Sequence, residues 1–198
     1  MSSEEQESED RRFRIIVGGP PNSGKSTFVE DLKRALEDEE VDVDSVDFDV
    51  WPPTLDLIQG KESSEQRASH KKREVTEKDI DDAKSRLERA SLVHQVVLMD
   101  GPGKISEQGA VLYRSATHSI IVCQEAAESE GKDWAKFLSS LELEPVAVVL
   151  TRLEGSQDEE RLEPGPPITA LLIGLNRQPR VTPVIRRLAS LVRRRLGV

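Results

Sequence analysis

Apolar residues along this chain recur with two different periods, which predicts strands alternating with helices. Short runs rich in Val, Ile and Leu predict buried strands at 13–19, 41–50, 95–100, 119–123, 146–151 and 168–173. Apolar positions at helical spacing predict helices over 25 to about 38, 76 to about 93 and 132–141, with a last helix from 182 onward. This alternation predicts a parallel sheet with helices on both faces, a three-layer α/β/α fold.

Aspartates occur at every second position in two parts of the second predicted strand, namely Asp42, Asp44, Asp47 and Asp49. We interpret them as a strand face in contact with water, because side chains that alternate in this way share one face. The alternative is that Asp47 or Asp49, near the end of the strand, accepts the proton of a substrate hydroxyl.

Eight residues between the first predicted strand and the first helix fit the pattern G-x-x-x-x-G-K-[ST]. They run from Gly19 to Ser26 and read Gly-Pro-Pro-Asn-Ser-Gly-Lys-Ser. Backbone N–H groups of such a loop converge with the helix dipole on one point, which suits a polyphosphate. The flanking strand and helix are the context that this motif requires, so we predict a Walker A phosphate-binding loop.

The motif assigns chemistry to particular side chains. Lys25 is expected to reach the β and γ phosphates, and the Ser26 hydroxyl is expected to ligate Mg2+. The full set of nucleotide-binding residues predicted from the loop and its rim is Gly19, Asn22, Ser23, Gly24, Lys25, Ser26 and Thr27.

A second motif follows the strand at 95–100. This strand ends in Asp100, and Gly101, Pro102 and Gly103 follow it as a D-x-x-G turn. Next to a phosphate loop, a carboxylate in this place is expected to hold Mg2+, and the Gly103 amide to sense the γ phosphate. Lys25 and Asp100 are therefore the main predicted catalytic residues, with Asp47 and Asp49 as further candidates.

Residues near these motifs indicate how fast hydrolysis should be and which nucleotide should bind. Gly101 stands next to Asp100, where some P-loop ATPases carry a glutamate that polarises water, so we expect slow hydrolysis. Thr151 and Glu154 stand where a GTPase has the Asn and Asp that recognise guanine. Thr151 remains a candidate nucleotide contact, and ATP is the expected nucleotide.

Composition and charge argue against several classes of protein. The chain has 198 residues and a net charge of -9, which argues against a generally basic nucleic-acid surface. RNA binding through a local basic patch stays open as an alternative but is not indicated. The single cysteine, Cys123, cannot form an internal disulfide, and no apolar run is long enough to span a membrane. We expect a cytoplasmic protein with a disordered acidic leader at 1–11 and one nucleotide-binding domain at 12–198, with a charged, lid-like insert at about 60–75.

These motifs resemble the branch of P-loop NTPases that contains small-molecule kinases, GTPases and MinD-like dimerising NTPases. A narrower resemblance rests on five segments, 18–26, 72–76, 100–103, 116–121 and the helix with Trp134. They look like the NTPase modules that accompany ring-nuclease accessory proteins of type III CRISPR systems. This resemblance implies a nucleotide-binding protein whose partner, if any, is a separate polypeptide or a second copy.

Three functions are consistent with the sequence. The preferred one is a Mg-dependent ATP-binding protein that hydrolyses ATP slowly and acts as a nucleotide-state switch. The second is a kinase that transfers phosphate to a hydroxyl of a small molecule or RNA, and the third is a partner module that senses ATP without turnover.

Overall fold

A seven-stranded sheet forms the centre of the computed structural model, which describes residues 12–48, 77–175 and 180–198. The strand order is β2-β3-β1-β4-β5-β7-β6, and all neighbours are parallel except β6, which pairs antiparallel with β7. The strands are β1 Phe13–Gly18, β2 Val43–Asp47, β3 Val96–Asp100, β4 His118–Gln124, β5 Glu144–Arg152, β6 Arg161–Glu163 and β7 Ile168–Ile173.

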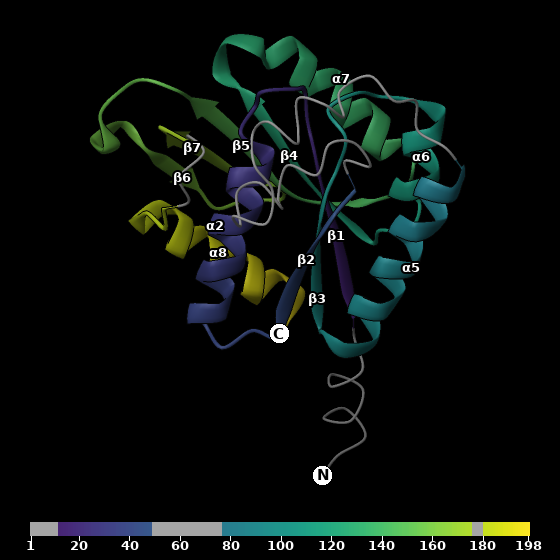
Figure 1. Ribbon diagram of the computed structural model, residues 1–198. Coiled ribbons are helices and arrows are strands. Elements are labelled where there is room, and N and C mark those ends of the chain that lie inside the picture. Colours follow the sequence, from purple (N-terminus) through teal and green to yellow (C-terminus); the bar gives the residue numbers. More distant parts are fainter. Residues whose placement is uncertain (1–11, 49–76, 176–179) are drawn as a thin grey trace, which may run out of the picture.

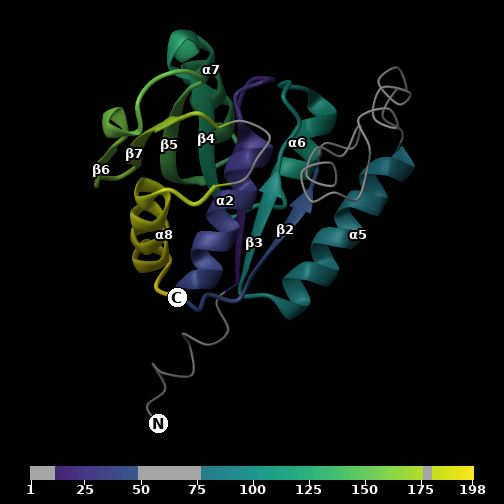
Figure 2. The same ribbon diagram turned by 60° about the vertical axis from the view of Figure 1, so that its left-hand side comes forward.

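Helices cover both faces of the sheet (Figures 1 and 2). On one face α2 (Lys25–Asp38) lies beside α8 (Pro183–Leu196). On the other face lie α5 (Glu77–Val93), α6 (Glu107–Tyr113) and α7 (Glu128–Ser139). Two short 3-10 turns, η1 (Glu125–Ala127) and η2 (Gln157–Glu159), follow β4 and β5. The predicted three-layer α/β/α fold is therefore confirmed.

Each face of the sheet has its own apolar core, because side chains alternate along each strand. In β1, Ile15 and Val17 pack with α2 and α8, whereas Ile16 packs with the helices of the other face. Burial on both faces is why the strands read as nearly continuous apolar runs. The carboxyl ends of the parallel strands thus share one edge of the sheet, where ligands of such folds bind.

The boundaries differ from the predicted ones where apolar patterning is weak. β5 extends to 144–152 and α7 begins at Glu128, because the polar residues at their ends add no apolar signal. The alternation of strands and helices predicted a helix between the strands at 95–100 and 119–123 without bounds, and α6 lies there, whereas the edge strand β6 was not predicted. The leader at 1–11, the insert at about 60–75 and Asp49 lie outside the described residues.

Candidate nucleotide site

The predicted phosphate loop connects the carboxyl end of β1 to the start of α2. At Gly19, where φ is 152°, a Cβ would lie 1.9 Å from the Val122 carbonyl oxygen. No side chain fits in that space, so only glycine allows the loop to pass this close to β4. Gly24 follows at φ 89° as the N-cap residue of α2. The free N–H groups of the first helical turn are thus directed toward the loop.

Polar side chains of the loop lie mostly inside it. The Lys25 Nζ donates a hydrogen bond of 3.0 Å to the Pro20 carbonyl, so the side chain folds back across the loop. Ser23 is 2% exposed, and its Oγ has no hydrogen-bond partner among the described residues. Ser26 is half-buried, while Thr27 is buried beneath it. A buried hydroxyl without a partner is costly, and a ligand oxygen that accepted from Ser23 would remove that cost.

Two strands on the side of β1 away from β3 hold the loop in place. Gln124, at the end of β4, donates from Nε2 to the Asn22 carbonyl over 2.9 Å. The Thr151 Oγ1, on β5, donates to the Ser23 carbonyl, also over 2.9 Å. Thr151 was predicted as a nucleotide contact, but in this structure its hydroxyl is used to position the loop. Gln124 was not predicted, because no sequence pattern connects it to a loop 100 residues earlier.

Asp100 ends β3 next to β1, in register with Val17, which lies two residues before Gly19. Its other neighbour is Asp47 on β2, with which it is also in register. Val43 and Val96 both pack on the α2 side of the sheet, and two-residue alternation places Asp47 and Asp100 on that same side. Two carboxylates from neighbouring strands thus lie at one edge of the sheet, on the side where α2 begins.

The interpretation of Asp47 as part of a water-exposed strand face is wrong. Asp47 is 5% exposed and Asp100 is 1% exposed. The period-two pattern was misleading because β2 is covered by α2 on one side and by α5 on the other. Of the strand's four aspartates, Asp42 is exposed and Asp44 is partly buried, while Asp49 lies outside the described residues.

The D-x-x-G turn lies directly against the phosphate loop. A Cβ on Gly103 would lie 3.0 Å from the Pro21 Cα, so the two backbones are in contact here. The turn is held at its base by a hydrogen bond from the Gly101 N–H to the Val17 carbonyl, 3.0 Å. The Tyr113 hydroxyl of α6 donates to the Pro102 carbonyl over 2.9 Å. Tyr113 is a second residue of the site that the sequence analysis did not identify.

Salt bridges fix the segment after β5, where the base-recognition residues of a GTPase would lie. Arg152 donates to the Glu125 carboxylate over 2.7 and 2.9 Å and also pairs with Glu159. The hydrogen bonds and charge of Glu125 raise the pKa of Arg152 above its ordinary value. The next two residues, Leu153 and Glu154, are exposed.

Neither a metal cluster nor a membrane span is found in the described part of the chain. Within residues 12–48, 77–175 and 180–198, no three His, Cys, Asp or Glu side chains form a metal-binding group. Over the same residues, no helix has both the length and the apolar composition to cross a membrane. Cys123 is buried, which raises the pKa of its thiol and fits its expected role as a small apolar side chain.

Comparison with known proteins gives one family match over part of the chain and structural matches over most of it. The model of the family described as "Chromatin associated protein KTI12" matches residues 14–103, which is less than half of the chain. This stretch contains the phosphate loop, Asp47 and the turn at 100–103. A search of curated proteins found no match.

Several solved structures share the whole architecture. The cell division ATPase MinD of Pyrococcus furiosus superposes with a TM-score of 0.65 and 18% identity, over 91% of this chain and 98% of that one. MinD of Aquifex aeolicus gives 0.60 and 16%, over 94% and 97%. The septum site-determining protein MinD of Pyrococcus horikoshii, complexed with Mg-ADP, gives 0.52 and 17%, over 74% and 72%. At these identities the similarity establishes the fold alone, and the fold of this chain is that of a P-loop NTPase.

Proposed function

We propose that this protein binds Mg-ATP at the loop Gly19–Ser26, hydrolyses it slowly and changes the conformation of the 100–103 turn with the state of the nucleotide. The observation that carries the proposal is the contact between Gly103 and Pro21, which joins the turn directly to the phosphate loop. A change in the loop is therefore transmitted to the turn without an intermediate side chain. The Mg-ADP in the Pyrococcus horikoshii structure supports this choice of ligand.

Each side chain of the loop has a separate role in this proposal. Lys25 exchanges its bond to the Pro20 carbonyl for the β and γ phosphates, which become the stronger acceptors because they are charged. Ser23 donates its unpartnered hydroxyl to a phosphate oxygen. Backbone N–H groups of Asn22, Gly24 and Thr27 complete the cradle, and Thr27 is oriented toward the α phosphate.

The residues present fit a magnesium ion. Asp47 and Asp100 place two buried carboxylates on neighbouring strands, and a divalent cation offsets the repulsion between them. Mg2+ prefers hard oxygen ligands and usually keeps several waters, so the Asp100 carboxylate and the Ser26 hydroxyl suffice alongside phosphate. When bound, the ion neutralises charge that develops on the phosphate oxygens.

A kinase is the second candidate, and the burial of Asp47 favours it. Asp47 lies beside Asp100 and is nearly excluded from water, as expected for a base that accepts a proton from a bound hydroxyl. Asp49 stays a further candidate for the same role outside the described residues. A third possibility, an ATP-sensing module without turnover, uses the same loop but needs neither carboxylate as a base.

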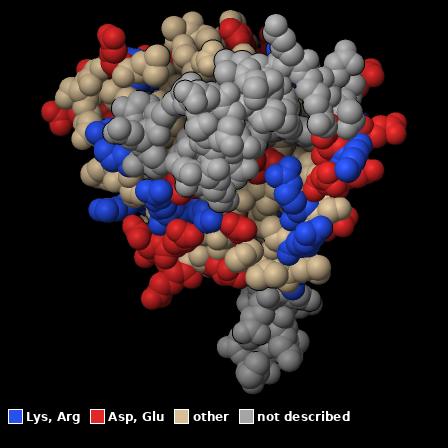
Figure 3. Space-filling model, in the orientation of Figure 1, with Lys and Arg blue, Asp and Glu red and all other residues tan. Residues whose placement is uncertain are grey.

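The partner and setting are also part of the proposal. A MinD–MinC complex is known for Aquifex aeolicus, and by analogy we propose a separate protein partner or a homodimer for this chain. On the face drawn in Figure 3 the described residues mix basic and acidic side chains, so this face offers RNA no broad basic patch. The comparisons do not show the link to ring-nuclease accessory proteins. We retain a cytoplasmic location and a single domain at 12–198, with a closing insert at about 60–75, as proposals.

Thermal unfolding with and without Mg-ATP tests the central proposal. At about 100 times its dissociation constant, the ligand should stabilise the fold by roughly 2.7 kcal/mol. For a chain of this size the melting temperature should rise by roughly 5 to 10 °C. Lys25→Ala should lose most of this shift, and Arg34→Ala on the exposed part of the same helix should keep it. An equal shift in Lys25→Ala would remove the loop from the binding site.

Two Asp→Asn variants then distinguish a role in metal binding from a role as general base. Asp100→Asn should keep nucleotide binding but lose the dependence of binding on Mg2+, measured by titration calorimetry. Asp47→Asn should leave slow phosphate release nearly unchanged if the protein is a switch. If it is a kinase, the same substitution should reduce transfer of labelled phosphate to an acceptor by about 10²- to 10⁴-fold. Label that appears on an acceptor and is lost in Asp47→Asn would reject the switch.

A further inference from the structure

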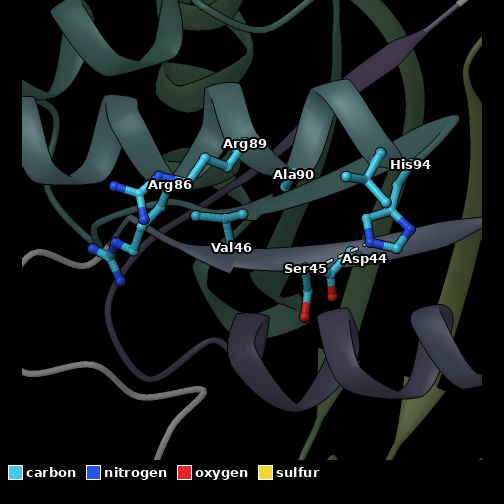
Figure 4. A pocket seen from close by; sticks show the side chains of 8 residues that line it. Asp44, Ser45, Val46, Arg86, Arg89, Ala90 and His94 are labelled. Carbon is cyan, nitrogen blue, oxygen red and sulfur yellow. Dashed lines mark ion pairs between the residues drawn. The ribbon is translucent and has the colours of Figure 1, made fainter.

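A groove of about 530 Å³ runs between the edge strand β2 and helix α5, away from the phosphate loop. Figure 4 shows it from close by, with Val46 on its strand side and Arg86, Arg89 and Ala90 on its helix side. One wall is therefore the backbone of a strand, and the other is a helix face with two guanidinium groups.

The strand wall presents backbone groups that point outward. At the two ends of the ladder with β3, the Asp42 carbonyl accepts from Val96 over 3.0 Å and the Phe48 N–H donates to Asp100 over 2.8 Å. Even-numbered residues of β2 therefore bond to β3, and in a parallel ladder the residues between them direct N–H and C=O away from it. Val43 and Ser45 are two of these. Because β2 ends the strand order, no described strand pairs with them.

The helix wall carries positive charge that the described residues do not neutralise. Arg86 and Arg89 are exposed, lie three positions apart on one helix face and form no ion pair with any described residue. In Figure 3 blue side chains lie along the α5 side of the molecule.

Acidic side chains at the strand wall already have partners. Asp44 pairs with Lys33 over 2.8 Å, and His94 lies 2.7 Å from Asp42. Burial disfavours the charge of Asp44, but hydrogen bonds from Lys33 and from the Ser45 N–H outweigh it and lower the pKa of Asp44. The Ser45 N–H is thus already bonded to the Asp44 carboxylate, so the outward groups available to a partner are the N–H and C=O of Val43 and the C=O of Ser45. The two arginines thus remain as the uncompensated charges of the groove.

Apolar side chains continue the groove toward the end of α5. Val46 and Ala90 lie between the strand and the helix. At the end of the helix Leu92 and Val93 are 72% and 71% exposed, although both are large apolar residues. Exposed apolar groups beside a polar groove mark a surface that a partner covers.

We propose that an extended, acidic segment of another protein adds to the sheet along β2. Its backbone would pair with the outward N–H and C=O of Val43 and with the outward C=O of Ser45, as in other cases of strand addition. Its carboxylates would reach Arg86 and Arg89, and an apolar side chain would cover Val93. A peptide suits this groove better than a nucleic acid, because an edge strand offers N–H and C=O groups that pair with a peptide backbone, and no described Phe, Trp or Tyr lines the groove for base stacking.

Titration of this chain with a synthetic peptide tests the inference. The probe is a nonapeptide in which glutamate alternates with threonine, so that one face of the added strand is acidic. Binding should weaken at least tenfold in the double variant Arg86→Gln with Arg89→Gln. The matched control is Arg186→Gln with Arg187→Gln, two exposed arginines on α8, which should bind as the unmodified protein does.

Amide hydrogen exchange tests whether the peptide backbone pairs with β2. The peptide should slow exchange of the outward N–H group of Val43 at least tenfold. It should change much less the inward groups of Asp44 and Val46 and the Ser45 N–H, which is already bonded to the Asp44 carboxylate. A second peptide with proline in place of each threonine lacks the N–H groups that a ladder needs and should bind at least tenfold more weakly.

Four results would overturn the proposal. The first is that the proline peptide binds as tightly as the threonine peptide. The second is that the Arg86 and Arg89 double variant binds the peptide as tightly as the unmodified protein does. The third is that a ten-nucleotide thymidine strand binds more tightly than the acidic peptide. The fourth is slow exchange at Val43 before any peptide is added, which would mean that this chain covers its own edge.

Discussion

Asp31 allows a quantitative test of the packing between α2 and the segment before α8. Its side chain is fully buried in the second turn of α2. Burial raises the pKa of Asp31 from 3.8 to about 6, and the Arg180 N–H and the positive charge of Arg34 offset this only in part. Because the folded state holds the proton more tightly than the unfolded state, ionisation of Asp31 opposes folding.

The sign and size of the effect follow from the two pKa values. A carboxyl whose folded pKa is raised adds no penalty below about pH 4, and its penalty grows as the pH rises toward and through about 6. The full difference of about 2 pKa units corresponds to ~3 kcal/mol of unfolding free energy above pH 7. Between pH 5 and pH 7.5 this penalty grows by ~1.4 kcal/mol.

Asp31→Asn removes the ionisation while keeping the size and a carbonyl acceptor. We expect the unfolding free energy of this variant, relative to the unmodified protein, to rise by ~1.4 kcal/mol between pH 5 and pH 7.5. Urea unfolding at both pH values measures it, and Asp38→Asn, an exposed carboxylate of the same helix, controls for the loss of one charge. A difference between Asp31→Asn and the unmodified protein that is equal at the two pH values would show that Asp31 is not perturbed by burial.

Three further predictions concern the phosphate site. Thr151→Val should raise the dissociation constant of ATP by roughly 5- to 10-fold in calorimetry, because one loop contact worth about 1 kcal/mol is lost; unchanged affinity would contradict the role of this contact. Gly19→Ala should abolish the ATP-induced rise in melting temperature, since its Cβ would meet the Val122 carbonyl at 1.9 Å. Tyr113→Phe should lower the melting temperature by roughly 2 to 4 °C, the effect of one hydrogen bond of about 1 kcal/mol in a chain of this size. A normal melting curve for this variant would mean that the Pro102 carbonyl finds another donor.

The central strands were predictable from sequence because both of their faces are buried. The residues 170–173 and 96–99 form uninterrupted apolar runs, and the structure places strands there. The phosphate loop was recognisable for a different reason: its function requires particular residues at consecutive positions. In both cases the information lies within a short stretch of chain.

Features that depend on distant contacts were not predictable in this way. Asp47 is polar, and only the packing of α2 and α5 around β2 buries it. β6 has three residues, of which Arg161 and Glu163 are polar, and it exists because β7 offers it a pairing edge. Tyr113 reaches the turn only because α6 packs on the same face of the sheet as α5 and α7. For each of these residues the deciding partner lies elsewhere in the chain.

The bonds from Gln124 and Thr151 make the phosphate loop a nonlocal structure. Its eight residues are consecutive, yet its shape is maintained by side chains 102 and 128 positions away from the residues they hold. Grafting the eight residues onto another strand and helix would transfer the motif without the conformation. Conversely, substitutions near the end of β5 can alter nucleotide affinity while leaving every residue of the motif intact, so an unchanged loop sequence is not sufficient to maintain the site.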